Sequence, residues 1–401
     1  MERYKFNKWL TCNMFIAILF LSGTGRTFAG NGNDWAIRMA QSEMKRHPEG
    51  WMVDLGKAPQ WNYTQGLVSL AFLKVWELNH NLEYFNYAKG YADKLIDSLG
   101  NIVGYKMNDY SLDRVNSGKI LFPLFSETKD SRYKTAIDIL RKQLKDQPRT
   151  TDGGFWHKKV YPHQMWLDGI YMATPFLAQY GFVYNDTASI NDALSQIITI
   201  QKHTFDSKTG LNYHAWDESK QQAWANPVTG CSPNFWGRAL GWYYMALVDV
   251  LDFIPENYPR RSEIITIIRS LTPKIIDVQD RQSGVWYQVL DQGTRSGNYL
   301  ESSASCMFVY GMLKAIRKGY IDKSFKVAAV KGYNGILKTF IRENPDKTIS
   351  ITRGCAVAGL GGKPYRSGTF EYYIGEKIRD DDAKAVGPFI MASLEYDLIG
   401  N

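Results

Sequence analysis

Cysteine is scarce in this sequence and shows no paired motif. The 401 residues include four cysteines, of which Cys12 lies near the N-terminus. The other three, Cys231, Cys306 and Cys355, are odd in number and far apart, so they predict neither a disulfide framework nor a zinc site. The six histidines are equally dispersed, and none forms a His-x-x-x-His pair. We therefore expect a protein that uses no metal and no other cofactor.

Other binding signatures are also missing. The glycines between residues 354 and 368 form no Walker or dinucleotide pattern, which argues against phosphate binding. The formal net charge of +8 is scattered along the chain without a basic stripe, so nucleic acid is not an expected partner. Alternation typical of strands is sparse, and its clearest cases are residues 210–216 and 284–290.

No apolar run reaches the ~20 residues that a membrane span needs, but the N-terminus has the layout of a signal peptide. Residues 1–29 begin with basic side chains, continue with an apolar run over 14–21 and end in Thr27-Phe28-Ala29, a small-x-small cleavage site. We expect cleavage and export, to the periplasm or the medium, with no membrane association afterwards. An uncleaved anchor is the alternative. Cleavage removes four cations and one acid, which lowers the net charge from +8 to +5.

Apolar residues recur at helical spacing along most of the chain. The spacing predicts helices over 34–47, 63–79, 82–98, 112–126, 130–145, 163–181, 186–203, 235–253, 259–279, 300–317, 323–343 and 379–397. Short links alternate with long loops rich in glycine and aromatic residues, near 99–111, 146–162, 204–234, 280–299 and 344–378.

This pattern favours an all-α fold, an (α/α)6 barrel in which six outer helices surround six inner ones. An open superhelix of stacked hairpins is the alternative, although no repeat of fixed period is present. Because no change in composition marks a boundary, we expect residues 30–401 to form a single domain. The long loops are the expected place of function.

One carboxylate stands out near the start of the helix predicted over 163–181. Asp168 follows Met165-Trp166-Leu167 and precedes Gly169-Ile170-Tyr171, so it either faces solvent at a helix start or lies in an apolar pocket, where it would suit a general acid. Asp113 also begins a predicted helix, a position where a carboxylate usually caps the helix or faces its dipole. His214, in a loop, is more often a hydrogen-bonding residue than an acid or a base.

The segment Phe235 to Leu247 places Arg238 and Trp242 one turn apart on one helix face. The arginine can form a fork with a carboxylate or stack on Trp242. Gly237 and Gly241 share the same spacing and would let a backbone or a ligand come close.

Aromatic residues make up 14% of the chain, and many tryptophans lie in loops or at helix starts. Such rings stack on sugar faces, although any single tryptophan more often packs in a core. The set comprises Trp156, Trp166, Trp216, Trp224, Trp236, Trp242 and Trp286.

Three separate stretches, in the same order along the chain, carry a family resemblance. Residues 165–173, residues 236–242 and the tail from Gly361 through Tyr372-Tyr373 to Gly387 resemble glycoside hydrolase family 105, the unsaturated rhamnogalacturonyl hydrolases. The resemblance implies an (α/α)6 catalytic domain. It also implies release of a 4,5-unsaturated galacturonic acid from the non-reducing end of rhamnogalacturonan-derived oligosaccharides, by protonation and hydration of the C4=C5 enol ether.

The resemblance also implies roles for particular residues. Asp168 matches the catalytic acid/base and Asp113 the second essential carboxylate. The matched substrate-pocket positions are His214, Arg238, Trp242, Trp166, His157 and Lys158.

Three other functions remain open from the sequence. An unsaturated glucuronyl hydrolase would share the fold and chemistry but act on glycosaminoglycan fragments, or on other unsaturated uronides produced by lyases. A non-catalytic oligosaccharide-binding toroid would keep the aromatics, although the presence of both Asp113 and Asp168 speaks against it. A glycosidase for saturated sugars would need a second carboxylate across the anomeric carbon, for which Asp291 or Glu371 could be nominated.

Overall fold

Helices dominate the part of the chain that the computed structural model describes, residues 35–400, of which 58% are helical. The predicted signal peptide, residues 1–29, lies outside this part. The helices are α1 (Trp35–Arg46), α2 (Tyr63–Asn79), α3 (Leu82–Leu95), α4 (Asp113–Asn116), α5 (Leu121–Thr128), α6 (Ser131–Asp146), α7 (Leu167–Tyr184), α8 (Thr187–Thr204), α9 (Gly237–Val250), α10 (Arg261–Asp277), α11 (Ser302–Arg317), α12 (Lys326–Phe340), α13 (Phe370–Gly375) and α14 (Ala383–Gly400).

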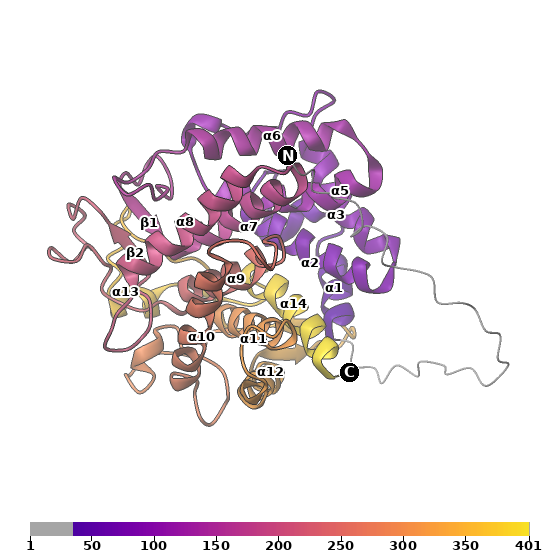
Figure 1. The fold of residues 1–401 in the computed structure, drawn as a ribbon. Coiled ribbons are helices and arrows are strands. Elements are labelled where there is room, and N and C mark those ends of the chain that lie inside the picture. Colours follow the sequence, from indigo (N-terminus) through magenta and orange to yellow (C-terminus); the bar gives the residue numbers. More distant parts are fainter. Residues whose placement is uncertain (1–34, 401) are drawn as a thin grey trace. The chain divides into compact units, whose positions relative to one another are not determined.

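Six inner helical segments make a closed ring (Figure 1). In order they are α2, the α4–α5 segment with its 3-10 turn η3 (Ser117–Ile120), α7, α9, α11 and α14, and each contacts the next, with α14 returning to α2. The outer helices α3, α6, α8, α10, α12 and α1 cover these six in the same order. The first helix thus covers the last one. The predicted (α/α)6 arrangement is confirmed.

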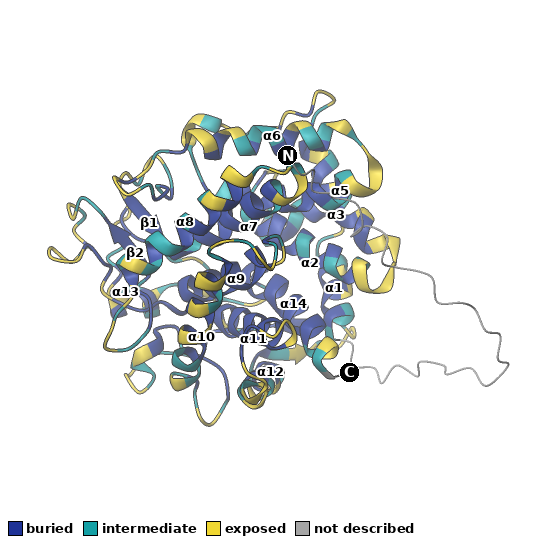
Figure 2. Ribbon diagram, viewed as in Figure 1, coloured by how far each residue is buried: buried dark blue, intermediate teal, exposed yellow. Residues whose placement is uncertain are grey.

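Inner and outer helices differ in burial, as Figure 2 shows. Every residue of α9 is buried, and so is every residue of α11 except Arg317, as expected of helices packed on all sides. Outer helices bury one stripe; α6 buries Tyr133, Ile137 and Leu140 while its other face meets solvent. In residues 35–400, no helix combines the length and apolarity needed to cross a bilayer.

Two-residue links connect several inner helices to the following outer ones. In each link a residue with positive φ ends the first helix, and the side chain of the next residue, Asn or Asp, accepts a backbone hydrogen bond from the first turn of the second. The links are His80-Asn81, Lys129-Asp130 and Asn185-Asp186.

Short strands form three antiparallel pairs between the helices: β1 (Gln164–Trp166) with β2 (Ala215–Asp217), β3 (Ile341–Glu343) with β4 (Ile349–Ile351), and β5 (Gly354–Cys355) with β6 (Ile378–Arg379). The strand predicted over 210–216 overlaps β2 only at its end. The prediction over 284–290 is wrong. That segment makes single bridges from Val289 to Trp236 and from Tyr287 to Leu300, because it passes the starts of two helices instead of lying along a second strand.

The inner helices all begin at the same end of the ring. Tyr63 at the start of α2 is close enough to Asp113, Arg238 and Asp382 to feel their charges, and these residues lie at or just before the starts of α4, α9 and α14. The long loops lead into these helix starts, since each connects an outer helix to the next inner one. Side chains from distant parts of the sequence therefore gather at this end.

Candidate active site

The register of the β1–β2 pair brings Asp168 and His214 together. Trp166 pairs with Ala215, so the residues that continue from each strand end are neighbours. The backbone N–H of Leu167 donates to the carbonyl of His214 over 3.0 Å. Asp168 follows in the first turn of α7, and its Oδ2 lies 3.1 Å from Nε2 of His214.

Asp168 is mostly buried and has no strong partner. Its side chain is 14% exposed, yet Oδ2 is inaccessible to solvent and makes no hydrogen bond, although His214 Nε2 lies close to it. Among the described residues, no lysine or arginine pairs with this carboxylate. An acid so placed has a carboxyl group free to act on a ligand.

His214 is completely buried and is fixed from behind. Its Nδ1 lies 2.7 Å from the hydroxyl of Tyr373 on α13. Trp236 packs against both rings, with its centroid 4.8 Å from that of His214 and 5.7 Å from that of Tyr373. Sequence reasoning quoted Tyr373 in a family stretch but gave it no role. Its partner is 159 residues away, a separation that helical periodicity does not reveal.

A second pair of adjacent loops positions Asp113. The N–H of Leu112 donates to the carbonyl of His157, and the N–H of Lys159 donates to that of Asp109, so the two loops run side by side. Lys158 Nζ then lies 2.5 Å from Asp113 Oδ2, and His157 Nε2 lies 3.4 Å from Oδ1.

These contacts fix the charges around Asp113. Burial tends to raise the pKa of Asp113, but Lys158 and then His157 outweigh it, so this pKa lies below its usual value. Burial tends to lower the pKa of Lys158, but Asp113 holds it above its usual value. Burial lowers the pKa of His157 to about 4, against the opposing charge of Asp113. At neutral pH the group is an anion, a cation and a neutral imidazole.

An aromatic stack stands beside both carboxylates. The ring of Trp166 is parallel to that of His157, with centroids 4.6 Å apart, and to that of Tyr161, at 4.9 Å. The guanidinium of Arg366 lies 5.9 Å from the Trp166 ring and donates to the Tyr161 hydroxyl over 2.8 Å. Sequence reasoning assigned no role to Tyr161 or Arg366. A wall of this kind suits a sugar ring and its hydroxyls.

Arg238 begins α9 and is 1% exposed. Its Nη1 donates to the carbonyl of Cys355, and its guanidinium lies 4.9 Å from the Trp236 ring. Stacking on Trp242 was one of the two predicted options, and the structure shows Trp236 in that place instead. Neighbouring Glu301 and Asp382 supply negative charge that holds the pKa of Arg238 up against its burial.

Trp242 lies one turn below Arg238 and is buried among rings. It stacks on Tyr171, with centroids 4.8 Å apart, and meets Tyr63 edge-on at 6.4 Å. The two glycines of this helix allow close packing against α11 and do not face a ligand. A Cβ on Gly237 would lie 3.1 Å from Ala304, and one on Gly241 would lie 2.9 Å from Met307.

The remaining candidates lie elsewhere. Glu371 is exposed and pairs with Arg295, and Asp291 is exposed; neither contacts Asp168 within the described residues. Trp286 donates to the carbonyl of Ile275 in the core. Trp224 packs in a small cluster with Trp166, so of these two tryptophans only Trp224 borders the aromatic stack.

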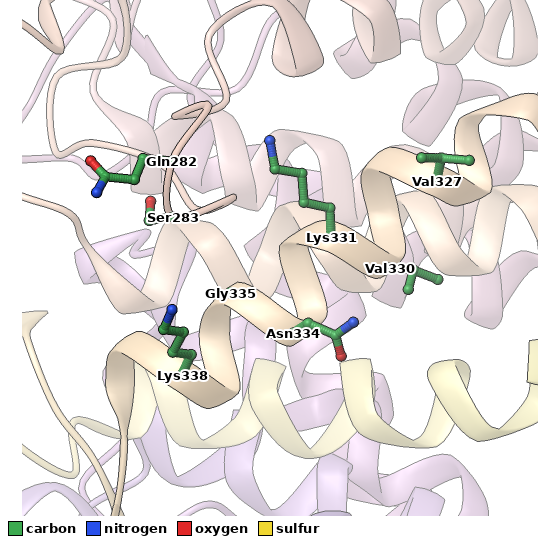
Figure 3. A pocket seen from close by; sticks show the side chains of 8 residues that line it. All are labelled: Gln282, Ser283, Val327, Val330, Lys331, Asn334, Gly335 and Lys338. Atoms are coloured by element: carbon green, nitrogen blue, oxygen red, sulfur yellow. The ribbon is translucent and has the colours of Figure 1, made fainter.

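The described chain contains neither a cluster of metal ligands nor an exposed thiol. No three histidine, cysteine or acidic side chains of residues 35–400 come together as metal ligands, and Cys231, Cys306 and Cys355 are buried free thiols. A hollow of about 430 Å³ on α12 contains Lys331 and Lys338 but no carboxylate and none of the predicted site residues (Figure 3).

The model of Glycosyl Hydrolase Family 88 matches residues 35–398. The chain belongs to this family. A solved Clostridium acetobutylicum glycoside hydrolase of family 105 is 43% identical, with a TM-score of 0.88 over 91% of this chain and 99% of that one. A 24.9 kDa protein in the picA locus of Rhizobium radiobacter is 40% identical over 57% of this chain and 99% of its own length. The unsaturated rhamnogalacturonyl hydrolase YesR of Bacillus subtilis is 28% identical over 66% of this chain and 74% of its own length.

Membership in Glycosyl Hydrolase Family 88 makes the protein a glycoside hydrolase of the unsaturated uronyl type. This family acts on oligosaccharides that carry an unsaturated uronic acid.

Proposed function

We propose that the protein releases a 4,5-unsaturated galacturonic acid from the non-reducing end of rhamnogalacturonan fragments. The observation that carries this proposal is that only one of the two carboxylates has a cationic partner. Asp113 is held as an anion by Lys158, whereas Asp168 has neither a lysine nor an arginine partner among the described residues. One dominant acid is what enol-ether hydration needs, while an ordinary glycosidase uses two carboxylates across the anomeric carbon.

Asp168 acts first as an acid and then as a base. Its proton goes to C4 of the sugar, the C4=C5 π bond supplies the electron pair, and positive charge develops at C5 and the ring oxygen. The carboxylate then takes a proton from a water that bonds to C5. The hemiketal then opens: the bond between C5 and the ring oxygen breaks, C5 becomes a ketone, and the former ring oxygen stays on C1 as a hydroxyl. C1 now carries this hydroxyl and the leaving sugar, and it becomes an aldehyde as the sugar departs.

The other residues bind and orient the substrate. Asp113 accepts hydrogen bonds from sugar hydroxyls beside the acid, and the Trp166 stack covers one face of the ring. Arg238 attracts the uronate carboxylate, with Lys158 as the second cation at the site. His157 lies beside Asp113, and His214 lies beside Asp168. The rhamnogalacturonan preference is supported by similarity to YesR.

Loss of the ultraviolet absorbance of the enol ether tests the reaction directly. Lyase-digested rhamnogalacturonan oligosaccharides are mixed with the purified protein, with a saturated uronide as control. We expect the absorbance to fall and the terminal sugar to appear, and we expect no cleavage of the control. Unsaturated glycosaminoglycan fragments form a third arm, and a preference for them would replace the rhamnogalacturonan assignment with a glucuronyl one.

Asp168→Asn is the matched variant for this assay. The amide keeps the shape of the side chain but cannot give the proton, so the variant should fold normally and lose about 10²- to 10⁴-fold in turnover. Near-normal turnover by this variant would remove Asp168 from the chemistry.

We also propose that the protein is exported. The proposal is supported by the basic, apolar and small-x-small segments of residues 1–29. Recovery of the protein from the periplasm or medium, with its N-terminus at Gly30, is the expected result, and a cytoplasmic product that retains Met1 would contradict it.

A further inference from the structure

Tyr373 is buried behind the site and cannot touch the reacting atoms through its hydroxyl, which faces His214. In the described part of the chain, that hydroxyl has no hydrogen-bond partner other than Nδ1 of His214, at 2.7 Å. His214 is itself fully buried, so water does not replace this contact. Of the Tyr373 hydroxyl and His214 Nδ1, one must therefore donate the hydrogen and the other must accept it.

The structure positions Tyr373 tightly. Its ring lies parallel to Trp236, at an angle of 14°, and its backbone carbonyl accepts from Gln288 Nε2 over 3.1 Å. The side-chain oxygen of the same glutamine accepts from Trp236 Nε1 over 3.1 Å. Gln288 thus ties α13 to the start of α9, so Tyr373 and Trp236 form one rigid support for the imidazole.

The direction of the Tyr373–His214 hydrogen bond follows from the chemistry of the phenol. Burial raises the pKa of Tyr373 well above its usual value, so the hydroxyl keeps its proton and needs an acceptor. Nδ1 of His214 is the acceptor at hand. A neutral imidazole that accepts at Nδ1 carries its proton at Nε2.

That Nε2 proton is on the side of the imidazole that lies next to the acid, although it makes no hydrogen bond to the carboxylate in the free protein. Nε2 lies 3.1 Å from Asp168 Oδ2, an oxygen that is closed to solvent. A hydrogen on Nε2 at this distance disfavours a second hydrogen on Oδ2, because two hydrogens would then face each other between atoms 3.1 Å apart. The proton that Asp168 transfers is then held on Oδ1, the oxygen that remains available to a ligand.

We propose that Tyr373 is a positioning residue that, through His214, selects the oxygen of Asp168 from which the proton leaves. The inference rests on the proposed function for its kinetic consequence. The Nε2–H form of His214 in the free protein does not depend on that function.

Nitrogen NMR of protein labelled in histidine tests the free protein first, because protonated and unprotonated ring nitrogens differ in chemical shift. We expect His214 to carry its proton on Nε2. A proton on Nδ1 in the unmodified protein would overturn the proposal, whether or not any variant folds.

Tyr373→Phe removes the hydroxyl and keeps the ring. We expect the nitrogen signals of His214 to move toward a mixture of the two forms. With lyase-digested rhamnogalacturonan oligosaccharides, we expect kcat to fall about tenfold, the loss of one hydrogen bond, with KM changed by less than about twofold.

Tyr244→Phe is the matched control, because Tyr244 has a buried hydroxyl bonded to Thr272 over 2.6 Å, between α9 and α10. It should leave kcat unchanged. An equal loss of kcat in both variants would overturn the proposal, since a general loss of packing would then explain it.

A double variant separates positioning from packing. In a His214→Gln background, Tyr373→Phe should cause no further loss of kcat, because its effect passes through the imidazole. An additive loss would overturn the proposal. If the unmodified protein does not act on these oligosaccharides, the proposed function fails, and the NMR result still decides the role of Tyr373.

Discussion

The ion pair of Lys158 with Asp113 allows a sharp prediction, because the next residue provides its own control. Lys158→Met removes the cation 2.5 Å from Asp113 and keeps the length and apolar body of the side chain. Lys159→Met removes the same charge from an exposed lysine that has no carboxylate partner among the described residues. The two variants have the same net charge, and only Lys158→Met breaks an ion pair with a carboxylate.

The size of the effect follows from burial. The Lys158 and Asp113 side chains are 26% and 16% exposed, so the pair lies between a surface pair, worth about 0–1 kcal/mol, and a buried one, whose disruption costs about 3–5 kcal/mol. We expect Lys158→Met to lower the free energy of unfolding by about 2 kcal/mol at pH 7. For Lys159→Met we expect a change of less than about 0.5 kcal/mol.

The pH dependence has a definite sign. The pKa of Asp113 is lower in the folded protein than its usual value of 3.8, so its stabilising contribution is complete above that value and is lost as the pH falls through the folded pKa. Without Lys158, burial raises the pKa of Asp113, and the carboxyl takes up a proton at higher pH. The gap in stability between the variant and the unmodified protein should therefore already be narrower at pH 4 than at pH 7.

Urea unfolding at pH 7 and at pH 4 measures both quantities, with turnover recorded in parallel. Identical unfolding midpoints for the two variants at pH 7 would refute the reasoning, because the pair would then contribute no more than an exposed lysine. A gap that persists undiminished in acid would show that packing of the Lys158 stem, and not its charge, supplies the stability.

Two further variants test other buried cations. Arg238→Gln should raise KM for unsaturated uronides about tenfold or more, with a smaller change in kcat, and an unchanged KM in steady-state kinetics would leave Arg238 a purely structural role. Lys119→Met should raise the free energy of unfolding at pH 7 by up to about 4 kcal/mol, because burial lowers the pKa of Lys119 from 10.5 to about 7. The cost of burying the charged lysine is complete below pH 7 and fades as the pH approaches 10.5. Urea unfolding that shows no gain in stability at pH 7, or a gain that persists at pH 10, would contradict this prediction.

The helical framework could be predicted from the sequence because each helix carries its own periodic signal. All twelve predicted helices occur, and the errors lie mostly at their ends. The helix predicted from residue 163 begins at Leu167, since residues 164–166 pair as β1. The segment predicted over 112–126 is divided by η3. The closed ring itself followed from helix number and loop alternation, with support from the family resemblance.

The site was only partly predictable, for a physical reason. Asp168 was noticeable as a lone carboxylate in an aromatic and apolar stretch, whereas Asp113 resembled an ordinary helix-start residue and gained its role from the family resemblance. Their partners depend on contacts between distant segments, such as His214 with Tyr373 and Trp166 with Arg366. No local spacing encodes such contacts. The ring that faces Arg238 was missed for a different reason, since Trp236 and Trp242 both lie near Arg238 in sequence and only the position of the helix start decides between them.

The pairing of the first helix with the last one bears on how the protein is made. α14 contacts α11, α2 and α1, so it both closes the inner ring and provides the surface that α1 covers. During synthesis the ring cannot close until α14 has left the ribosome, and until then the flanks of α2 and α11 that it covers stay open. This order of folding would help a chain that is exported before it folds, because the barrel cannot complete its folding in the cytoplasm while the last helix is still being synthesised.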